Sequence, residues 1–318
     1  MAVTRRAVSD GGFCGRLDAL RVVVGGLRLE HPVMNASGVL GSSPAGIAKL
    51  ASLGFSAVVT KTLTPEPREG FSPPIIVQLP TGGILNAVGL ANPGRGAIPA
   101  LVSAGREAGL PVIVSIGGRD AGEFAGLAEV AEDAGAAAVE LNLSCPNARG
   151  YGMELGSDPR VVREVVRAVD STVGIPVMAK LGLSDRVVES AGAALEGGAD
   201  ALVLINTVRA TYIDVYTLRP VLTATHGGLS GPPIHPIAVR VVYDVFREYG
   251  CDIVGVGGVH DWASAAEFIA AGAKAVQIGT AVAYDEGVVR KVVEGLARWV
   301  EVMGASSVSD LVGAAVRA

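Results

Sequence analysis

The sequence predicts an α/β fold, a (β/α)8 TIM barrel with an N-terminal hairpin and long βα insertions. Eight short apolar runs of strand length alternate with segments of helical periodicity, which is the element order of a parallel barrel. Several helices pass into the next strand through one kind of joint, seen in Ala134-Gly-Ala, Gly198-Ala-Asp and Ala271-Gly-Ala. Such a joint is typical of a helix C-cap that leads into a parallel strand.

The strands and helices can be placed along the chain. The expected barrel strands are residues 32–37, 57–62, 111–116, 138–144, 176–181, 201–207, 252–258 and 275–280. Residues 22–29 precede them as a hairpin that could close the bottom of the barrel. Asp158 and Asp261 each occupy an N-cap position before an apolar helical pattern, the first followed by Pro159. A doubly wound open sheet is the alternative, but no Gly-x-Gly-x-x-Gly follows the first strand.

The length of 318 residues suits one barrel domain, which we place at 18–318, with residues 1–17 as a flexible tail. Two connections, about 63–99 and 208–233, are too long for plain linkers. Both follow the carboxyl ends of strands, which form the catalytic face of a barrel. We therefore expect them to be functional lids or small added sheets.

Composition limits the possible partners. Half of the residues are hydrophobic, the net charge is −5 and no basic stripe occurs, which argues against nucleic acid. The three cysteines (Cys14 in the tail, Cys145, and Cys251 in the expected core) are too far apart for a disulfide framework or a cysteine metal cluster. The four histidines show no zinc spacing, so no metal is predicted. No apolar run approaches about 18 residues and no cleavable leader is visible, so we expect a cytoplasmic protein without a membrane anchor.

Polar residues gather at one rim of the expected barrel. The chain has only six asparagines: Asn35, Asn86, Asn92, Asn142, Asn147 and Asn206. All six map to the carboxyl ends of strands or to the loops that follow them. Of five lysines, Lys61 and Lys180 end two of the apolar strands. A lysine inside a barrel needs an anionic or electron-rich partner, so the pattern favours a polar ligand site over ordinary loop polarity.

The segment 140–147 carries the strongest chemical signal. An apolar strand is broken there by Ser144, Cys145 and Pro146, with Asn142 and Asn147 on either side. A thiol between two amides offers one proton-transfer group and several donors and acceptors for a planar polar ligand. The alternative is that the cysteine is a small buried hydrophobe, the commonest role of a free cysteine.

Glycines follow the last two strands, at Gly257-Gly258 and at Gly279-Thr280. Backbone amides at these places form the usual phosphate site of such barrels. The glycine-rich loop 226–235 could be a solvated turn or a flexible loop against a cofactor.

These residues together resemble a known family, the class 1 dihydroorotate dehydrogenases, and most closely their 1B catalytic subunit. The resemblance runs from the first strand to the last. Its motifs are Pro32-Val-Met-Asn-Ala-Ser-Gly, Lys61-Thr-Leu-Thr, Leu85-Asn-Ala-Val-Gly-Leu-Ala-Asn-Pro-Gly94, Glu140-Leu-Asn-Leu-Ser-Cys-Pro-Asn147, Asn206-Thr and Gly227-Gly-Leu-Ser-Gly-Pro. It implies FMN-dependent oxidation of (S)-dihydroorotate to orotate in de novo pyrimidine (UMP) biosynthesis.

The resemblance also implies roles for individual residues. Cys145 would be the base that removes the C5 proton while hydride leaves C6 for the flavin. The implied substrate-binding residues are Lys61, Asn86, Ala87, Val88, Gly89, Leu90, Asn142, Asn147, Asn206 and Thr207. The implied FMN-binding residues are Ser37, Lys61, Thr62, Asn142, Lys180, Ile205, Gly231, Gly257, Gly258, Gly279 and Thr280.

The implied partners are dihydroorotate and orotate, a second copy in a homodimer, and an FAD and iron–sulfur subunit that would complete a heterotetramer and pass electrons to NAD+. The sequence departs from the family at Ile76 and Gln78, where arginine and glutamate are usual. Residues 147–156 also resemble the pyrimidine-reducing domain of dihydropyrimidine dehydrogenase, although Asn147 in place of histidine favours the orotate enzyme. A dihydropyrimidine (dihydrouracil-type) oxidoreductase and a non-catalytic phosphate-ligand-binding barrel are therefore the alternatives.

Overall fold

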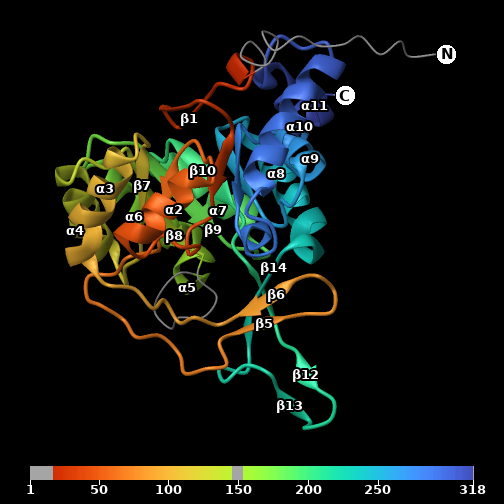
Figure 1. Cartoon of the computed structure of the whole chain (residues 1–318). Helices are drawn as coiled ribbons and strands as arrows, with labels where there is room; N and C mark the ends of the chain where they lie inside the picture. Colours follow the sequence, from red (N-terminus) through yellow and green to blue (C-terminus); the bar gives the residue numbers. More distant parts are fainter. Residues whose placement is uncertain (1–16, 145–152, 318) are drawn as a thin grey trace.

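Eight parallel strands form the centre of the molecule and confirm the predicted barrel (Figure 1). The computed structural model describes residues 17–144 and 153–317. The order around the sheet is β3 (Val33–Asn35), β16 (Ala275–Ile278), β15 (Ile253–Val256), β10 (Ala201–Leu204), β9 (Val177–Leu181), β8 (Ala138–Leu143), β7 (Val112–Ile116) and β4 (Val58–Val59). The predicted tail, residues 1–17, lies almost entirely outside the described residues.

The barrel closes between β3 and β4 mainly through side-chain hydrogen bonds, of which Asn35 makes two. The Asn35 amide donates to the carbonyl of Val59 at 2.8 Å and its Oδ1 accepts from the N–H of Val59 at 2.8 Å. One backbone bond, from Ser56 N to Val33 O at 3.0 Å, adds to this seam. The sequence interpretation grouped Asn35 with a ligand site. The structure shows it fully buried, acting as a substitute for the missing strand ladder.

Helices surround the strands, as the βα order requires (Figure 1). They are α2 (Pro44–Ser52), α3 (Ile98–Glu107), α4 (Ala121–Asp133), α6 (Pro159–Asp170), α7 (Val187–Glu196), α8 (His235–Tyr249), α9 (Trp262–Ala271) and α10 (Val288–Val302). Both predicted N-caps are confirmed, since the carboxylates of Asp158 and Asp261 accept from the first turns of α6 and α9. The inner face of α6 buries valines at helical spacing, including Val162 and Val166. No helix in the described ranges is long and apolar enough to cross a membrane.

The remaining elements are an N-terminal hairpin and several short helices. The hairpin β1 (Val22–Val24) and β2 (Leu27–Leu29) is antiparallel, as predicted, and Gly25 N donates to Asp252 Oδ2 at 2.9 Å just before β15. The short elements are α5 (Met153–Gly156), α11 (Ala314–Arg317), η1 (Arg95–Ala97), η2 (Pro232–Ile234), η3 (Thr280–Ala283) and η4 (Val308–Leu311).

The two long insertions, far apart in sequence, build one small sheet over the catalytic face. Its order is β11 (Val208–Ala210), β14 (Gly227–Ser230), β6 (Ile84–Asn86) and β5 (Ile76–Gln78). The added sheet was one of the two predicted outcomes. A second hairpin, β12 (Ile213–Asp214) and β13 (Arg219–Pro220), projects from it (Figure 1). Residues 226–235, expected as a solvated turn or a flexible loop against a cofactor, are mostly regular structure, since they hold β14, η2 and the start of α8.

Candidate active site

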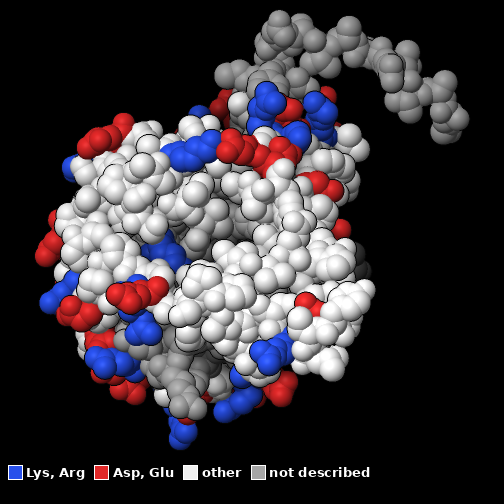
Figure 2. Space-filling model, turned by 60° about the horizontal axis from the view of Figure 1, so that its bottom comes forward, with Lys and Arg blue, Asp and Glu red and all other residues white. Residues whose placement is uncertain are grey.

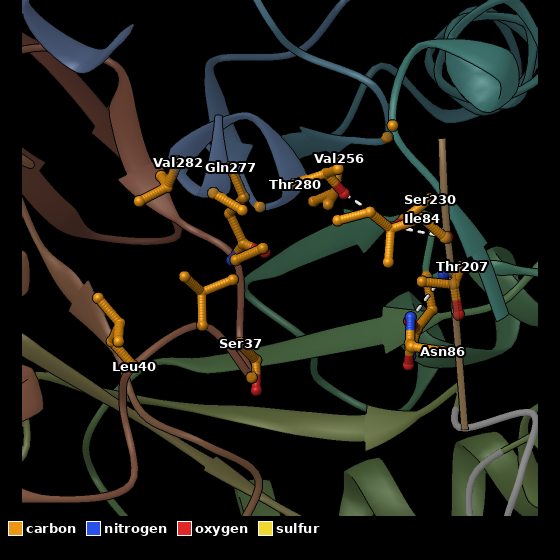
Figure 3. A pocket seen from close by; sticks show the side chains of 18 of the residues that line it. Ser37, Leu40, Ile84, Asn86, Thr207, Ser230, Val256, Gln277, Thr280 and Val282 are labelled. Atoms are coloured by element: carbon orange, nitrogen blue, oxygen red, sulfur yellow. Dashed lines mark hydrogen bonds between the residues drawn. The ribbon is translucent and has the colours of Figure 1, made fainter. Parts of the chain in front are cut away.

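A cavity of about 680 Å³ lies between the carboxyl ends of the barrel strands and the small sheet. Figure 2 shows the corresponding face of the molecule, hollowed and largely uncharged at its centre, with acidic and basic residues mainly around its edge. Figure 3 shows that side chains from both halves of the chain point into the cavity. Its size is within the range of pockets that bind small molecules and cofactors.

The structure brings most of the implied site residues together in this cavity. The residues that line it are Ser37, Lys61, Thr62, Asn86, Val88, Gly89, Leu90, Asn142, Lys180, Ile205, Asn206, Thr207, Gly231, Gly257, Gly258, Gly279 and Thr280. Ala87 is not among them, because its side chain is buried beneath the small sheet with Leu85 and Leu222. Cys145 and Asn147 lie outside the described residues. Of the two departures from the family pattern, Ile76 lines the cavity and Gln78 does not.

Asn142 is the centre of a hydrogen-bonded polar floor. It lies near the end of β8, and its Nδ2 donates to Thr62 Oγ1 at 2.9 Å. Thr62 in turn contacts Ser37 Oγ at 3.3 Å and Ser115 Oγ at 3.0 Å. On its other side, the Oδ1 of Asn142 accepts from the hydroxyl of Ser144 at 2.8 Å. These contacts fix the amide orientation, so that a ligand would meet pre-aligned donors and acceptors.

The network continues to the far wall of the cavity. Asn206 Nδ2 donates to Ser144 Oγ at 2.8 Å, and the N–H of Thr207 donates to Asn206 Oδ1 at 2.7 Å. Asn86, on β6, donates to the carbonyl of Gly228 on β14 at 3.2 Å, which joins the two insertions at the cavity edge (Figure 3). Ser144 is therefore anchored on both sides, at the point where the described part of β8 leads to residue 145.

Lys180 has a buried partner that the sequence interpretation required but did not identify. Its Nζ donates to Glu140 Oε1 at 3.3 Å and to Gln277 Oε1 at 3.1 Å, while Gln277 Nε2 donates to Glu140 Oε2 at 2.8 Å. All three side chains are buried, and they come from β9, β8 and β16. The sequence contained a pattern that could have identified these partners. Glu140 lies on the same inward face of its strand as Asn142, two residues further on, and Gln277 interrupts an apolar strand.

Lys61 follows β4 and is held by its backbone, whose N–H donates to the carbonyl of Gly41 at 2.8 Å. Its half-buried side chain lines the cavity. Lys61 and Lys180 are two of the three lysines that line the cavity; the third, Lys49, pairs with Glu286. Lys180 has a buried carboxylate beside it. Such a site suits a ligand with electron-rich or anionic groups.

The glycines after β15 and β16 form a cradle of backbone. Gly257 and Gly258 have φ values of +133° and +72°, a conformation that L-residues with side chains rarely adopt. A Cβ on Gly257 would lie 2.7 Å from the Cβ of Ala238, and one on Gly258 would lie 2.8 Å from the carbonyl oxygen of Gly231. Across the cavity, Thr280 Oγ1 donates to Ser230 Oγ at 2.8 Å. A concave surface of small residues and backbone amides fits a phosphate group.

Cys251 and His31 lie away from the polar floor. Burial raises the pKa of the Cys251 thiol to about 11, as expected for the predicted core position. His31 lies at the other end of the barrel, where burial lowers its pKa. Within residues 17–144 and 153–317, no group of three or more His, Cys, Asp or Glu residues could hold a metal ion.

Comparison with known proteins shows to which family the chain belongs. The family model described as dihydroorotate dehydrogenase matches residues 19–300. The chain belongs to the dihydroorotate dehydrogenase family. The resemblance drawn from its motifs is thereby confirmed.

Relatives within the dihydroorotate dehydrogenase family match nearly the whole chain. A putative dihydroorotate dehydrogenase A (fumarate) of Aeropyrum pernix is 51% identical over 94% of this chain and 98% of its own length. A dihydroorotate dehydrogenase B (NAD(+)) catalytic subunit of Thermoplasma acidophilum is 44% identical over 94% of this chain and 99% of its own length. The corresponding protein of Pyrococcus horikoshii is 45% identical over 94% of this chain and 98% of its own length.

Proposed function

We propose that this chain catalyses the FMN-dependent oxidation of (S)-dihydroorotate to orotate in de novo pyrimidine biosynthesis, in the cytoplasm. The observation that carries the proposal is the polar floor of the cavity, in a chain of the dihydroorotate dehydrogenase family. Asn142, Asn206 and Asn86 present amides to one space, together with the ammonium groups of Lys61 and Lys180. Dihydroorotate has a ring of amide groups and a carboxylate, which require donors, acceptors and cations of this kind.

The residues of the cavity fit FMN. The cradle at Gly257, Gly258 and Gly279 presents backbone without side chains to the cavity, which suits the phosphate, while Ser37, Thr62 and Asn142 offer hydrogen bonds to a polar ring system. When bound, the flavin would supply the hydride acceptor. Lys180, in the barrel interior, would stabilise the negative charge that a reduced flavin gains.

Cys145 is the proposed base, which takes the C5 proton onto its sulfur while hydride leaves C6. An ordinary thiol has a pKa of about 8.5 and is only a few per cent thiolate at neutral pH, so the rate should rise with pH. The residue before Cys145 is held in place: Ser144, which directly follows β8, is hydrogen-bonded to both Asn142 and Asn206. Asn147, the second amide of the same segment, is proposed to bind the substrate.

The electron acceptor is open to two proposals, because the names of the relatives differ. The B-type name suggests NAD+ as the acceptor. Three cysteines are fewer than the four that usually hold an iron–sulfur cluster, so this route would need a partner subunit with FAD and an iron–sulfur centre, in a heterotetramer built on a homodimer. The 51% identical relative, which is named for fumarate, supports the second proposal, in which fumarate is the acceptor.

The test is anaerobic titration of the FMN-loaded protein with dihydroorotate and, separately, with dihydrouracil. We expect dihydroorotate alone to bleach the flavin. Bleaching by dihydrouracil alone would favour the dihydropyrimidine oxidoreductase, and no bleaching by either would favour the non-catalytic barrel. Reoxidation of the reduced protein by fumarate, measured beside NAD+ with and without proteins that co-purify from the native source, separates the two acceptors.

A further inference from the structure

A second layer of residues lies behind the glycine cradle, where His235 contacts the backbone that faces the cavity. We propose that His235 is a positioning residue for the phosphate of the bound flavin nucleotide, acting through the peptide between Gly257 and Gly258. The inference rests on the proposed function, because it concerns the same cofactor.

His235 is held in one orientation by three contacts. It is the first residue of α8 and is buried, with Nδ1 3.0 Å from the carbonyl oxygen of Gly257. Its Nε2 lies 3.2 Å from Glu267 Oε2 on α9. The edge of its ring meets the ring of Phe268, with centroids 5.1 Å apart and planes at 87°. The imidazole therefore has little freedom to leave the Gly257 carbonyl.

Peptide geometry transmits this contact to the cavity side. In a planar trans peptide the C=O of one residue and the N–H of the next point in opposite directions. A fixed Gly257 carbonyl therefore fixes the direction of the Gly258 N–H. The same relation holds one residue later, because His260 Nδ1 lies 2.7 Å from the Gly258 carbonyl and so orients the N–H of Val259.

These two amides are available to a ligand. Gly258 and Val259 both line the cavity, and within the described residues neither N–H has a hydrogen-bond acceptor. Two successive amides with fixed direction form an anion-binding concavity. The left-handed φ values of the glycines make this loop dependent on outside contacts, because an unsupported loop would populate other conformations.

The ring of His235 lies between two acceptors. They are the Gly257 carbonyl and the Glu267 carboxylate, one beside each ring nitrogen. Glu267, which is 61% exposed, and His260, whose ring centroid lies 6.4 Å away, are the ionisable groups in contact with it.

The experiment compares FMN with riboflavin, which lacks the phosphate, by titrating the apoprotein and following flavin fluorescence. His235→Phe keeps the aromatic ring and its contact with Phe268 but removes both donors. We expect it to lower FMN affinity by about tenfold or more and to leave riboflavin affinity within about twofold. His235→Asn retains a donor near the position of Nδ1 and should recover part of the loss.

The matched control is His31→Phe, at the far end of the barrel, where another histidine ring contacts a backbone carbonyl, that of Gly54, at 3.1 Å. It should change neither affinity. Equal losses for FMN and riboflavin in His235→Phe would show a merely structural role, and unchanged FMN affinity would also overturn the proposal. If His235→Phe does not fold, Glu267→Gln is measured instead. We expect it to lower the affinity for FMN, but not for riboflavin, by about threefold. An unchanged FMN affinity in Glu267→Gln would contradict the inference. Wild-type protein that binds neither flavin would refute the proposed function instead.

Discussion

The ammonium of Lys180 lies 3.3 Å from the carboxylate of Glu140 in the interior of the barrel, where the two side chains are 4% and 0% exposed. Gln277 completes the contact by accepting from the lysine and donating to the carboxylate. If the Gln277 amide were flipped, its NH2 group would face the ammonium and its carbonyl would face the carboxylate. The two charged groups therefore determine the orientation of this amide. The fold therefore places the ammonium of Lys180 and the carboxylate that neutralises it side by side.

Removing this counter-charge should destabilise the fold. Glu140→Gln leaves a buried ammonium without its carboxylate, and we expect a loss of about 3 kcal/mol in the free energy of unfolding, measured by urea denaturation of the apoprotein at pH 7. Glu140→Gln/Lys180→Met, which removes both charges, should recover most of it. The exposed pair Lys49–Glu286 offers a control, since Glu286→Gln should cost less than about 1 kcal/mol. A double variant less stable than Glu140→Gln would contradict this account.

The thiols should differ in both function and reactivity. Cys145→Ala should lower kcat by more than about 100-fold, because the proposed base is lost, while orotate binding changes little. Burial raises the pKa of Cys251 to about 11, so at pH 8 iodoacetamide should leave it unmodified while it inactivates the enzyme at Cys145. Mass spectrometry of the alkylated protein, with and without orotate, locates the label. Full activity of Cys145→Ala would rule out its role as the base.

A methyl group at Gly228 should disturb the wall of the cavity at Thr207, a proposed substrate-binding residue. A Cβ there would lie 2.0 Å from Thr207 Oγ1, so Gly228→Ala must displace the threonine or the strand β14. We expect KM for dihydroorotate to rise by about tenfold while the affinity for FMN stays within about twofold. Gly126→Ala, on α4 with nothing within 4 Å of its Cβ, is the matched control and should stabilise the protein slightly. An unchanged KM would show that Thr207 does not position the substrate.

His31 should make the fold sensitive to mild acid. Burial lowers its pKa in the folded protein, while in the unfolded chain the value stays near 6.5. The unfolded state therefore binds more protons, and the stability from this residue is present above pH 6.5 and is lost as the pH falls through the folded pKa. Unfolding free energies measured between pH 7.5 and 5 should decline less steeply in His31→Gln than in wild type. Identical slopes would exclude His31 as the cause.

Local patterns in the sequence were sufficient to predict the barrel and the end of it at which the cavity lies. The period of the apolar residues, the glycine joints and the caps at Asp158 and Asp261 act within a few residues of one another, so they can be recognised without a structure. The rule that parallel strands present their carboxyl ends at one face then brought Asn142 and Lys180 to the same cavity. The family followed from the same motifs.

Pairs made by distant strands were decided only by the tertiary structure. From the sequence, Asn35 was grouped with the ligand site. In the structure its amide instead bonds to Val59 and helps to close the barrel between β3 and β4. The partner of Lys180 comes from 40 residues away in the chain, and the small sheet joins insertions separated by more than 100 residues. No local period encodes such contacts, because they depend on which strands become neighbours and which side chains then face each other without water.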